Sequence, residues 1–188
     1  MEAATLFNLS FTHWQAILLS LIPALITLAA IIYFRHFPSY KINTVYRLYL
    51  FSIFAWQLND SFSRMSINIQ TARSWDRLLC FGWILQFPSC IHFVLLLIGE
   101  QKLSNKSWFI FILYFPAFLF AVLLCSGLYA QSFLNLSFWG WTKTFSNFKS
   151  FEIVPALWVC STIIFSILLF GYFAFQHRNS PAKNIFLF

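Results

Sequence analysis

Charged side chains are scarce in this sequence. They make up 9% of its 188 residues, whereas hydrophobic types make up 60%. A chain of this length cannot bury so much apolar surface inside a water-soluble domain. The composition therefore excludes a soluble globular protein and indicates that lipid tails solvate much of the chain.

The motifs of the common enzyme classes are also missing. The sequence has no Gly-rich phosphate loop, no HExxH or GxSxG motif and no paired set of His and Cys ligands. The segments expected on the inner side of a membrane are too short to hold a nucleotide-binding domain. We therefore predict no enzyme activity, no catalytic residue, no metal and no cofactor for this chain.

The cysteines form no CxxC pair, and each falls inside an apolar segment rather than a loop. Their expected role is that of small apolar packing side chains. A helix-to-helix disulfide is an alternative for the first and third of them, which are both expected near the outer face of the membrane. The four cysteines are Cys80, Cys90, Cys125 and Cys160.

Five stretches of about twenty mostly apolar residues are present, and about twenty residues is the length that crosses a bilayer as a helix. The first stretch is too long for the apolar part of a signal peptide, and no basic region precedes it, so it should remain as an anchor. We therefore expect an all-α, polytopic transmembrane bundle of five spanning helices, with residues 1–188 as one domain. The predicted helices are 14–34, 46–65, 78–98, 108–128 and 153–175.

The basic residues are spread over all the loops, and no five of them cluster as in a nucleic-acid-binding patch. If the N-terminus is outside, the inner segments carry more of them than the outer segments do. This bias predicts an outer N-terminus and an inner C-terminus. The inner set is Arg35, Lys41, Arg47, Lys102, Lys106, Arg178 and Lys183, and the outer set is Arg64, Arg73, Arg77, Lys143 and Lys149.

The end of the chain has an unusual pattern. A polar segment, QHRNSPAK, is followed by a short apolar run, NIFLF, at the last residues. A natural C-terminus seldom stops one turn into a new hydrophobic segment. We therefore expect a chain truncated at the start of a sixth helix.

The second helix becomes polar towards its outer end. Gln57, Asn59 and Asp60 lie there, and Arg64 follows Asp60 at the i+4 position on the same face. Gln86 of the third helix is expected about 12 Å below that helix's outer end, at the depth of Asn59 and Asp60. Polar side chains at one depth hydrogen-bond between helices, so these residues either join the helices or line an outward-facing pocket for a small ligand.

Aromatic residues gather at the expected outer ends of the helices. Trp75 and Trp83 flank the start of the third helix, and the loop 129–152 contains two further tryptophans. Interfacial anchoring is the common role of such residues. A cage of Trp75, Trp83, Trp139 and Trp141 that encloses a ligand is the alternative, and Trp83 is the candidate ligand-binding residue among them. The loop should lie on the outer interface or fold over the mouth of the bundle.

The third helix also contains Pro88 and His92 in its middle and inner half. A single histidine inside a membrane is commonly a hydrogen-bonded packing residue, because a proton path needs further titratable partners at the same depth. A role of His92 and Pro88 in transmitting a signal is the alternative.

Residues 72–120 resemble the N-terminal seven-helix sensor region of bacterial membrane histidine kinases and some diguanylate cyclases. The resemblance is carried by an Ala-x-x-Trp-x-Arg-Leu entry, an apolar helix with a proline, a His-Phe-x-Leu step and a Tyr-x-Pro-Ala helix. The matching residues are Ala72, Trp75, Arg77, Leu78, Pro88, His92, Phe93, Leu95, Tyr114, Pro116 and Ala117.

This resemblance implies seven helices with an outer N-terminus, in the inner membrane of a bacterium. It also implies a sensory input domain that detects a small ligand or the state of the membrane and signals to a cytoplasmic output module, through which the protein forms a homodimer. Two other classes stay open. A transporter subunit would show internal repeats, and none is evident. A G-protein-coupled-type receptor would need a cysteine in the loop 129–152, which has none.

Overall fold

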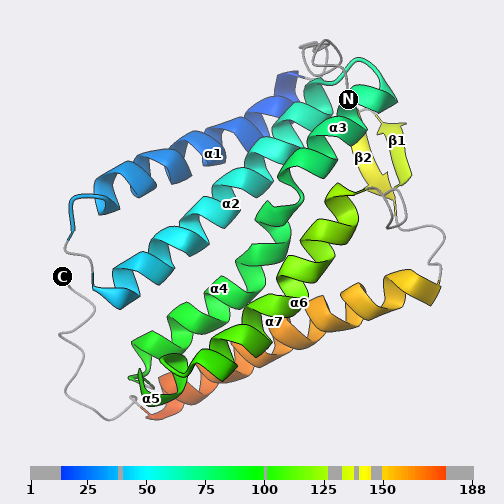
Figure 1. Cartoon of the computed structure of the whole chain (residues 1–188). Helices are drawn as coiled ribbons and strands as arrows, with labels where there is room; N and C mark the ends of the chain where they lie inside the picture. The colour runs from blue at the N-terminus through cyan, green and yellow to red at the C-terminus, as the bar shows by residue number, and fades with distance from the viewer. Residues whose placement is uncertain are drawn as a thin grey trace.

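The computed structural model describes residues 14–37, 40–99, 101–126, 133–137, 140–144 and 150–176. In this part of the chain, helices account for nearly all of the regular structure, and one two-stranded hairpin accompanies them (Figure 1). The helices are α1 (Trp14–Phe34), α2 (Lys41–Met65), α3 (Ile69–Leu79), α4 (Phe81–Leu97), α5 (Gln101–Ser104), α6 (Ser107–Cys125) and α7 (Ser150–Gln176).

The predicted helix 14–34 is confirmed as α1, and the fourth and fifth predicted helices correspond to α6 and α7. The start predicted for the second helix, residue 46, is too late, because α2 already begins at Lys41. The predicted outer connection 66–77 is wrong. It is helical from Ile69 onwards, and the Asn68 side chain caps this helix by accepting a hydrogen bond of 2.8 Å from the backbone N–H of Thr71.

Three helical segments, not five, are long and apolar enough to cross a membrane within the described residues. They are Ile17–Phe34, the combined α3–α4 segment Ile69–Leu97, and Ser107–Cys125. Helix α2 is long enough at 25 residues, but its polar and charged side chains lower its hydropathy. In α7, among the residues whose side chains are described, the apolar stretch is Cys160–Leu169. The three segments indicate an integral membrane protein.

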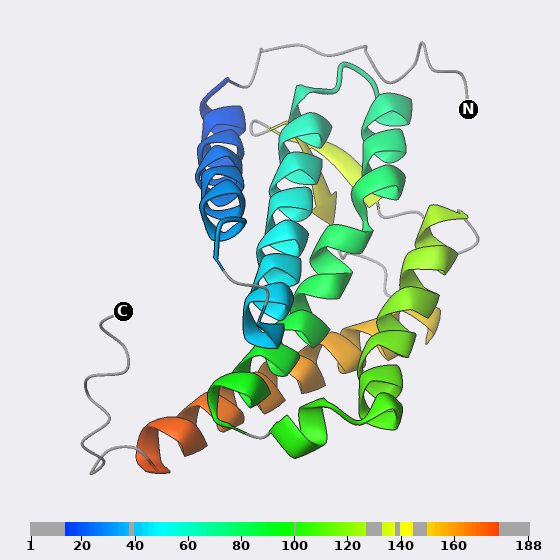
Figure 2. The same ribbon diagram turned by 60° about the vertical axis from the view of Figure 1, so that its left-hand side comes forward.

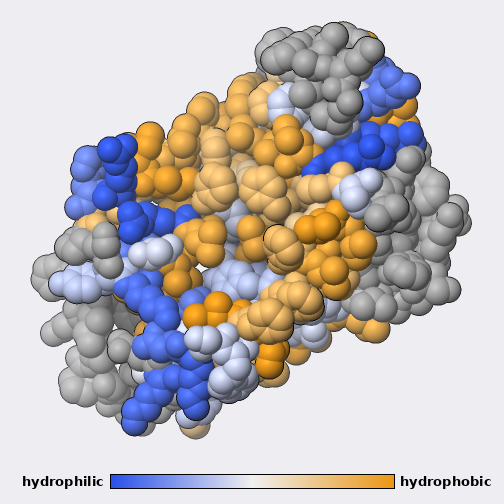
Figure 3. Space-filling model, viewed as in Figure 1, coloured by the Kyte–Doolittle hydropathy of each residue, from blue (hydrophilic) through white to orange (hydrophobic). Residues whose placement is uncertain are grey.

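The distribution of polarity over the surface agrees with a membrane location. In Figure 3 hydrophobic residues form a broad band over the middle of the helices, and hydrophilic residues gather towards the two ends. The exposed faces of α1 and α6 carry large apolar side chains such as Leu19, Ile26, Ile112 and Phe118. A surface of this kind is stable against lipid tails and unstable in water.

Helices α2 and α4 form the centre of the bundle. Helix α1 packs on α2, α2 packs on α4, and α4 packs on α6 and α7. Helix α3 leads into α4 at Cys80, and α7 crosses obliquely over α4 and α6 (Figure 2). Trp158 of α7 contacts both neighbours, with its ring centroid 6.3 Å from that of Phe87 and 5.6 Å from that of Phe120.

Two of the basic segments predicted to share one side of the membrane, around Lys41 and at 102–106, lie at the same end of the bundle, whereas Arg178 and Lys183 lie outside the described residues. The Lys41 ammonium group donates a hydrogen bond of 3.0 Å to the backbone carbonyl of Ser104 and a second bond to the side chain of Asn105. At this end Tyr46 of α2 packs between Phe34 of α1 and Phe93 of α4, with both centroid distances 4.9 Å. We call this the Lys41 end.

The loop 129–152 contains the antiparallel hairpin of β1 (Phe133–Ser137) and β2 (Gly140–Thr144). Strand β2 contacts α2 and strand β1 contacts α3, so the hairpin lies at the end of the bundle opposite Lys41, as Figure 1 shows. The expectation that this loop folds against the outer end is consistent with these contacts. Trp139 and the expected start of a sixth helix lie outside the described residues.

Helices α2 and α4 approach each other closely at Gly82. A Cβ atom added there would lie 2.8 Å from the backbone carbonyl carbon of Ala55 and 2.9 Å from its Cβ. Both distances are too short for carbon atoms, so a side chain at position 82 would push the helices apart. Small residues at such crossings allow the backbone contact that stabilises helices in membranes.

Gly82→Ala should therefore destabilise the folded bundle by about 1–3 kcal/mol, the usual cost of overpacking. Thermal unfolding in detergent measures the change. Gly171→Ala is the matched control, because a Cβ there meets no atom within 4 Å and α7 should gain only the helix preference of alanine. Equal behaviour of the two variants would contradict the close α2–α4 contact.

Candidate functional site

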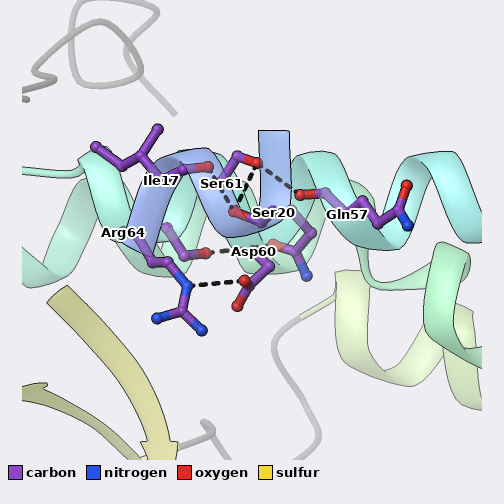
Figure 4. A network of polar contacts seen from close by, with 8 residues as sticks. Ile17, Ser20, Gln57, Asp60, Ser61 and Arg64 are labelled. Carbon is purple, nitrogen blue, oxygen red and sulfur yellow. Dashed lines mark hydrogen bonds and ion pairs between the residues drawn. The ribbon is translucent and has the colours of Figure 1, made fainter. Parts of the chain in front are cut away.

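The polar side chains of α2 face two different neighbours. On the α1 side, the Thr27 hydroxyl donates a hydrogen bond of 3.0 Å to Gln57 Oε1. Further along, the Ser61 hydroxyl lies 3.0 Å from Ser20 Oγ and 2.8 Å from the backbone carbonyl of Gln57 (Figure 4). These contacts satisfy groups that would otherwise be unpaired in hydrocarbon.

A buried amide of α2 and a buried carboxyl of α3 meet where these two helices face each other. Asn59 is 2% exposed, and its Nδ2 donates a hydrogen bond of 3.2 Å to Asp76 Oδ1. Asn59 Oδ1 accepts a bond of 3.3 Å from the Ser63 hydroxyl. Asp76, at 9% exposed, is thereby held against α2, and its burial is tolerable because it has a hydrogen-bond partner.

We call the residues that join α1, α2 and α3 in this way the outer polar cluster. They come from three helices and lie at the end opposite Lys41. The cluster consists of Ser20, Thr27, Gln57, Asn59, Ser61, Ser63 and Asp76.

The predicted pair of Asp60 and Arg64 is confirmed. Arg64 Nε donates to Asp60 Oδ2 at 2.7 Å, and the pair lies one turn apart on α2 (Figure 4). The side chain of Asp60 is 39% exposed and that of Arg64 is 21% exposed. The pair is therefore partly exposed at the edge of the outer polar cluster, rather than inside the bundle.

The predicted hydrogen bond between Gln86 and the second helix is wrong. Gln86 is half-buried on α4, and among the described residues its side chain bonds to neither Asn59 nor Asp60. Asn59 instead uses Asp76, because the helix α3 places a carboxyl against α2 at that depth. The similar depth expected for Gln86 and Asn59 in the membrane therefore did not identify the hydrogen-bond partner of Asn59.

The aromatic residues are arranged for packing. Trp75 of α3 stacks on Phe62 of α2, with a centroid distance of 4.2 Å and an angle of 18° between the planes. Trp83 is half-buried on α4. The stacking of Trp75 uses the ring face that an aromatic cage would need for a ligand.

His92 is 4% exposed, and its Nδ1 lies 3.2 Å from the Tyr114 hydroxyl of α6. Within the described residues its Nε2 has no hydrogen-bond partner. Pro88, one turn earlier in α4, is fully buried. The contact with Tyr114 gives His92 the packing and hydrogen-bonding role that is usual for a lone membrane histidine.

The most informative residue that the sequence reasoning missed is Asp76. It lies in the segment 66–77, between the predicted helices 46–65 and 78–98, and is therefore not expected to face another helix. The helical start was readable from Asn68, an N-cap residue type whose side chain can bond to the third residue of the helix.

No group of three or more His, Cys, Asp or Glu side chains able to hold a metal occurs in the described ranges.

Comparison with protein-family models, with curated proteins and with solved structures found no match for this chain. The resemblance of residues 72–120 to the sensor region of histidine kinases is therefore carried only by the residues quoted for it.

The two pairs at this site should differ in energy. For the buried pair, a double-mutant cycle of Asn59→Ala and Asp76→Ala should give a coupling free energy of about 1.5 kcal/mol or more, because each change removes the hydrogen bond that joins α2 to α3 in a dry environment. The measurement is the unfolding free energy of the four proteins in detergent.

The exposed pair is the internal comparison. A cycle of Asp60→Ala and Arg64→Ala should give a coupling of about 0.5 kcal/mol or less, as is usual for an i,i+4 ion pair that water screens. A coupling of Asp60 and Arg64 larger than that of Asn59 and Asp76 would show that the exposed pair, not the buried one, holds these helices.

Proposed function

We propose that this chain is a membrane-embedded sensory input domain of the histidine-kinase type. In this proposal α1, α2, the α3–α4 segment, α6 and α7 all cross the inner membrane of a bacterium, with the N-terminus outside. Support for α2 as a spanning helix comes from its position between α1 and the α3–α4 segment, which are both apolar enough to span. Its polar groups in the outer polar cluster face α1 and α3, and so do not need to face lipid.

The observation that carries the proposal is the position of the Asp60–Arg64 pair. The two side chains are accessible, yet they are attached to the same helix whose buried face is joined to α1 and α3 by the outer polar cluster. A small ligand with a charged or hydrogen-bonding group can compete for one member of the pair. Such competition changes the free-energy difference between two positions of α2 in the bundle.

Helix α2 also reaches the other end of the bundle. There Lys41, at the first turn of α2, bonds to Ser104 and Asn105, in the turn between α5 and α6. A shift of α2 at its outer end would therefore alter contacts at the Lys41 end. Small helix shifts of this kind are a known form of signalling, provided that two packed states differ by only a few kcal/mol. The proposed partner at that end is a cytoplasmic output module that dimerises.

The first experiment tests the orientation of the bundle. In a cysteine-free background, Ile67→Cys should react with a membrane-impermeant thiol reagent in intact cells, because Ile67 is exposed between α2 and α3 at the proposed outer end. Lys102→Cys, exposed at the opposite end, should react only after the cells are opened. The reverse labelling pattern would overturn the proposed orientation.

The second experiment tests the sensory role. The assay uses membrane vesicles that contain this chain extended by the polypeptide that its downstream coding sequence encodes. In these vesicles, Asp60→Ala should change the basal rate of autophosphorylation about twofold. This is the shift in a two-state population that follows from losing an ion pair of about 0.5 kcal/mol. The rate is measured by transfer of labelled phosphate from ATP.

The matched control is the exchanged pair, Asp60→Arg with Arg64→Asp. It keeps the attraction between the two side chains and should return the rate towards that of the unchanged protein. The proposal fails if no output module follows in the coding sequence, or if all three proteins have the same rate.

A further inference from the structure

Two cysteines from distant parts of the sequence lie side by side. Cys80 lies between α3 and α4, and Cys125 is the last residue of α6. Their sulfur atoms are 3.2 Å apart. Cys80 is 2% exposed, whereas Cys125 is exposed.

The position of the pair is fixed by contacts on both sides. Cys125 Sγ lies 3.0 Å from the backbone carbonyl oxygen of Arg77, in the last turn of α3. Cys80 Sγ lies 3.8 Å from the carbonyl oxygen of Ala121, in the last turn of α6. Each thiol is therefore directed towards the helix that carries the other. A disulfide needs an S–S distance of about 2.05 Å, so the two sulfur atoms have to approach by only about 1.2 Å.

We propose that Cys80 and Cys125 are a reversible redox site, at which a disulfide fastens the α3–α4 junction to the end of α6. This inference rests on the geometry of the two thiols and does not depend on the sensory role. In this proposal the two thiols form a covalent bond, whereas the ordinary role of cysteines in membrane helices is to pack as small apolar side chains.

The oxidant is a disulfide, either a small one such as oxidised glutathione or the active-site disulfide of a thiol oxidoreductase. The exposed Cys125 loses its proton, and its thiolate attacks one sulfur of the oxidant. A mixed disulfide forms, and one thiolate leaves and takes up a proton. The thiolate of Cys80 then attacks the Cys125 sulfur and expels the second thiol. Two protein thiols are oxidised, and the oxidant is reduced to two thiols by the two electrons and two protons that it receives.

The surroundings favour such a site. In the proposed orientation, this end of the bundle faces the outer side of the membrane, where disulfides form and persist. Asp76 lies one helical turn before Cys80 and bonds to Asn59 of α2. A covalent link at Cys80 would therefore restrain α3 next to the outer polar cluster, and it would connect the redox state to the packing of α2.

Differential alkylation tests the proposal. Membranes containing the intact chain are equilibrated with oxidised glutathione, accessible thiols are blocked, the protein is denatured, and the remaining thiols are alkylated and identified by peptide mass spectrometry. We expect a Cys80–Cys125 peptide pair that is lighter than the two thiol peptides by two hydrogen atoms. Dithiothreitol should separate it. In detergent, the oxidised protein should melt a few degrees above the reduced protein.

Substitution of the other two cysteines provides the controls. The variant Cys90→Ser with Cys160→Ser should still form the pair, because Cys90 and Cys160 take no part in it. Cys80→Ser should leave Cys125 as a thiol or as a glutathione adduct. A stable glutathione adduct on Cys125 in the unchanged protein, or alkylation of Cys80 and Cys125 to the same extent as Cys90 and Cys160, would overturn the proposal.

Discussion

Polar groups of a helix that is surrounded by other membrane helices must find partners inside the protein, because lipid offers none. Helix α2 carries several polar side chains to which this constraint applies. Its Gln57 and Ser61 contact α1, and its Asn59 contacts Asp76 of α3. These hydrogen bonds join α2 to both neighbours and satisfy polar groups that a more apolar helix would not carry.

The same requirement separates the structural groups from the accessible ones. Asn59 and Asp76 are buried and bonded to each other, so they hold helices together. Asp60 and Arg64 lie on the same helix but keep part of their surface exposed. At Gly82 the backbones of α2 and α4 are in close contact, so the buried groups and this contact together hold α2 in place.

Local features were predictable from the sequence. The limits of α1 followed from the length of an apolar run, and the Asp60–Arg64 pair followed from the i,i+4 spacing on a helix. The proximity of Cys80 and Cys125 was also foreseen as an alternative, because two antiparallel helices bring their outer ends together. Helix α3 was missed because its many polar residues concealed a helix that is amphipathic rather than apolar.

The sequence by itself determined that the chain belongs in a membrane, where its apolar helices lie and which basic segments share an end, since these depend on composition and on neighbours along the chain. Only the tertiary structure decided which polar side chains meet. Gln86 and Asp76 were both available to Asn59, and a depth estimate favoured Gln86. The packing of α3 against α2 selected Asp76. A hydrogen bond depends on the rotation and approach of two helices, and neither is encoded in the spacing of residues along one of them.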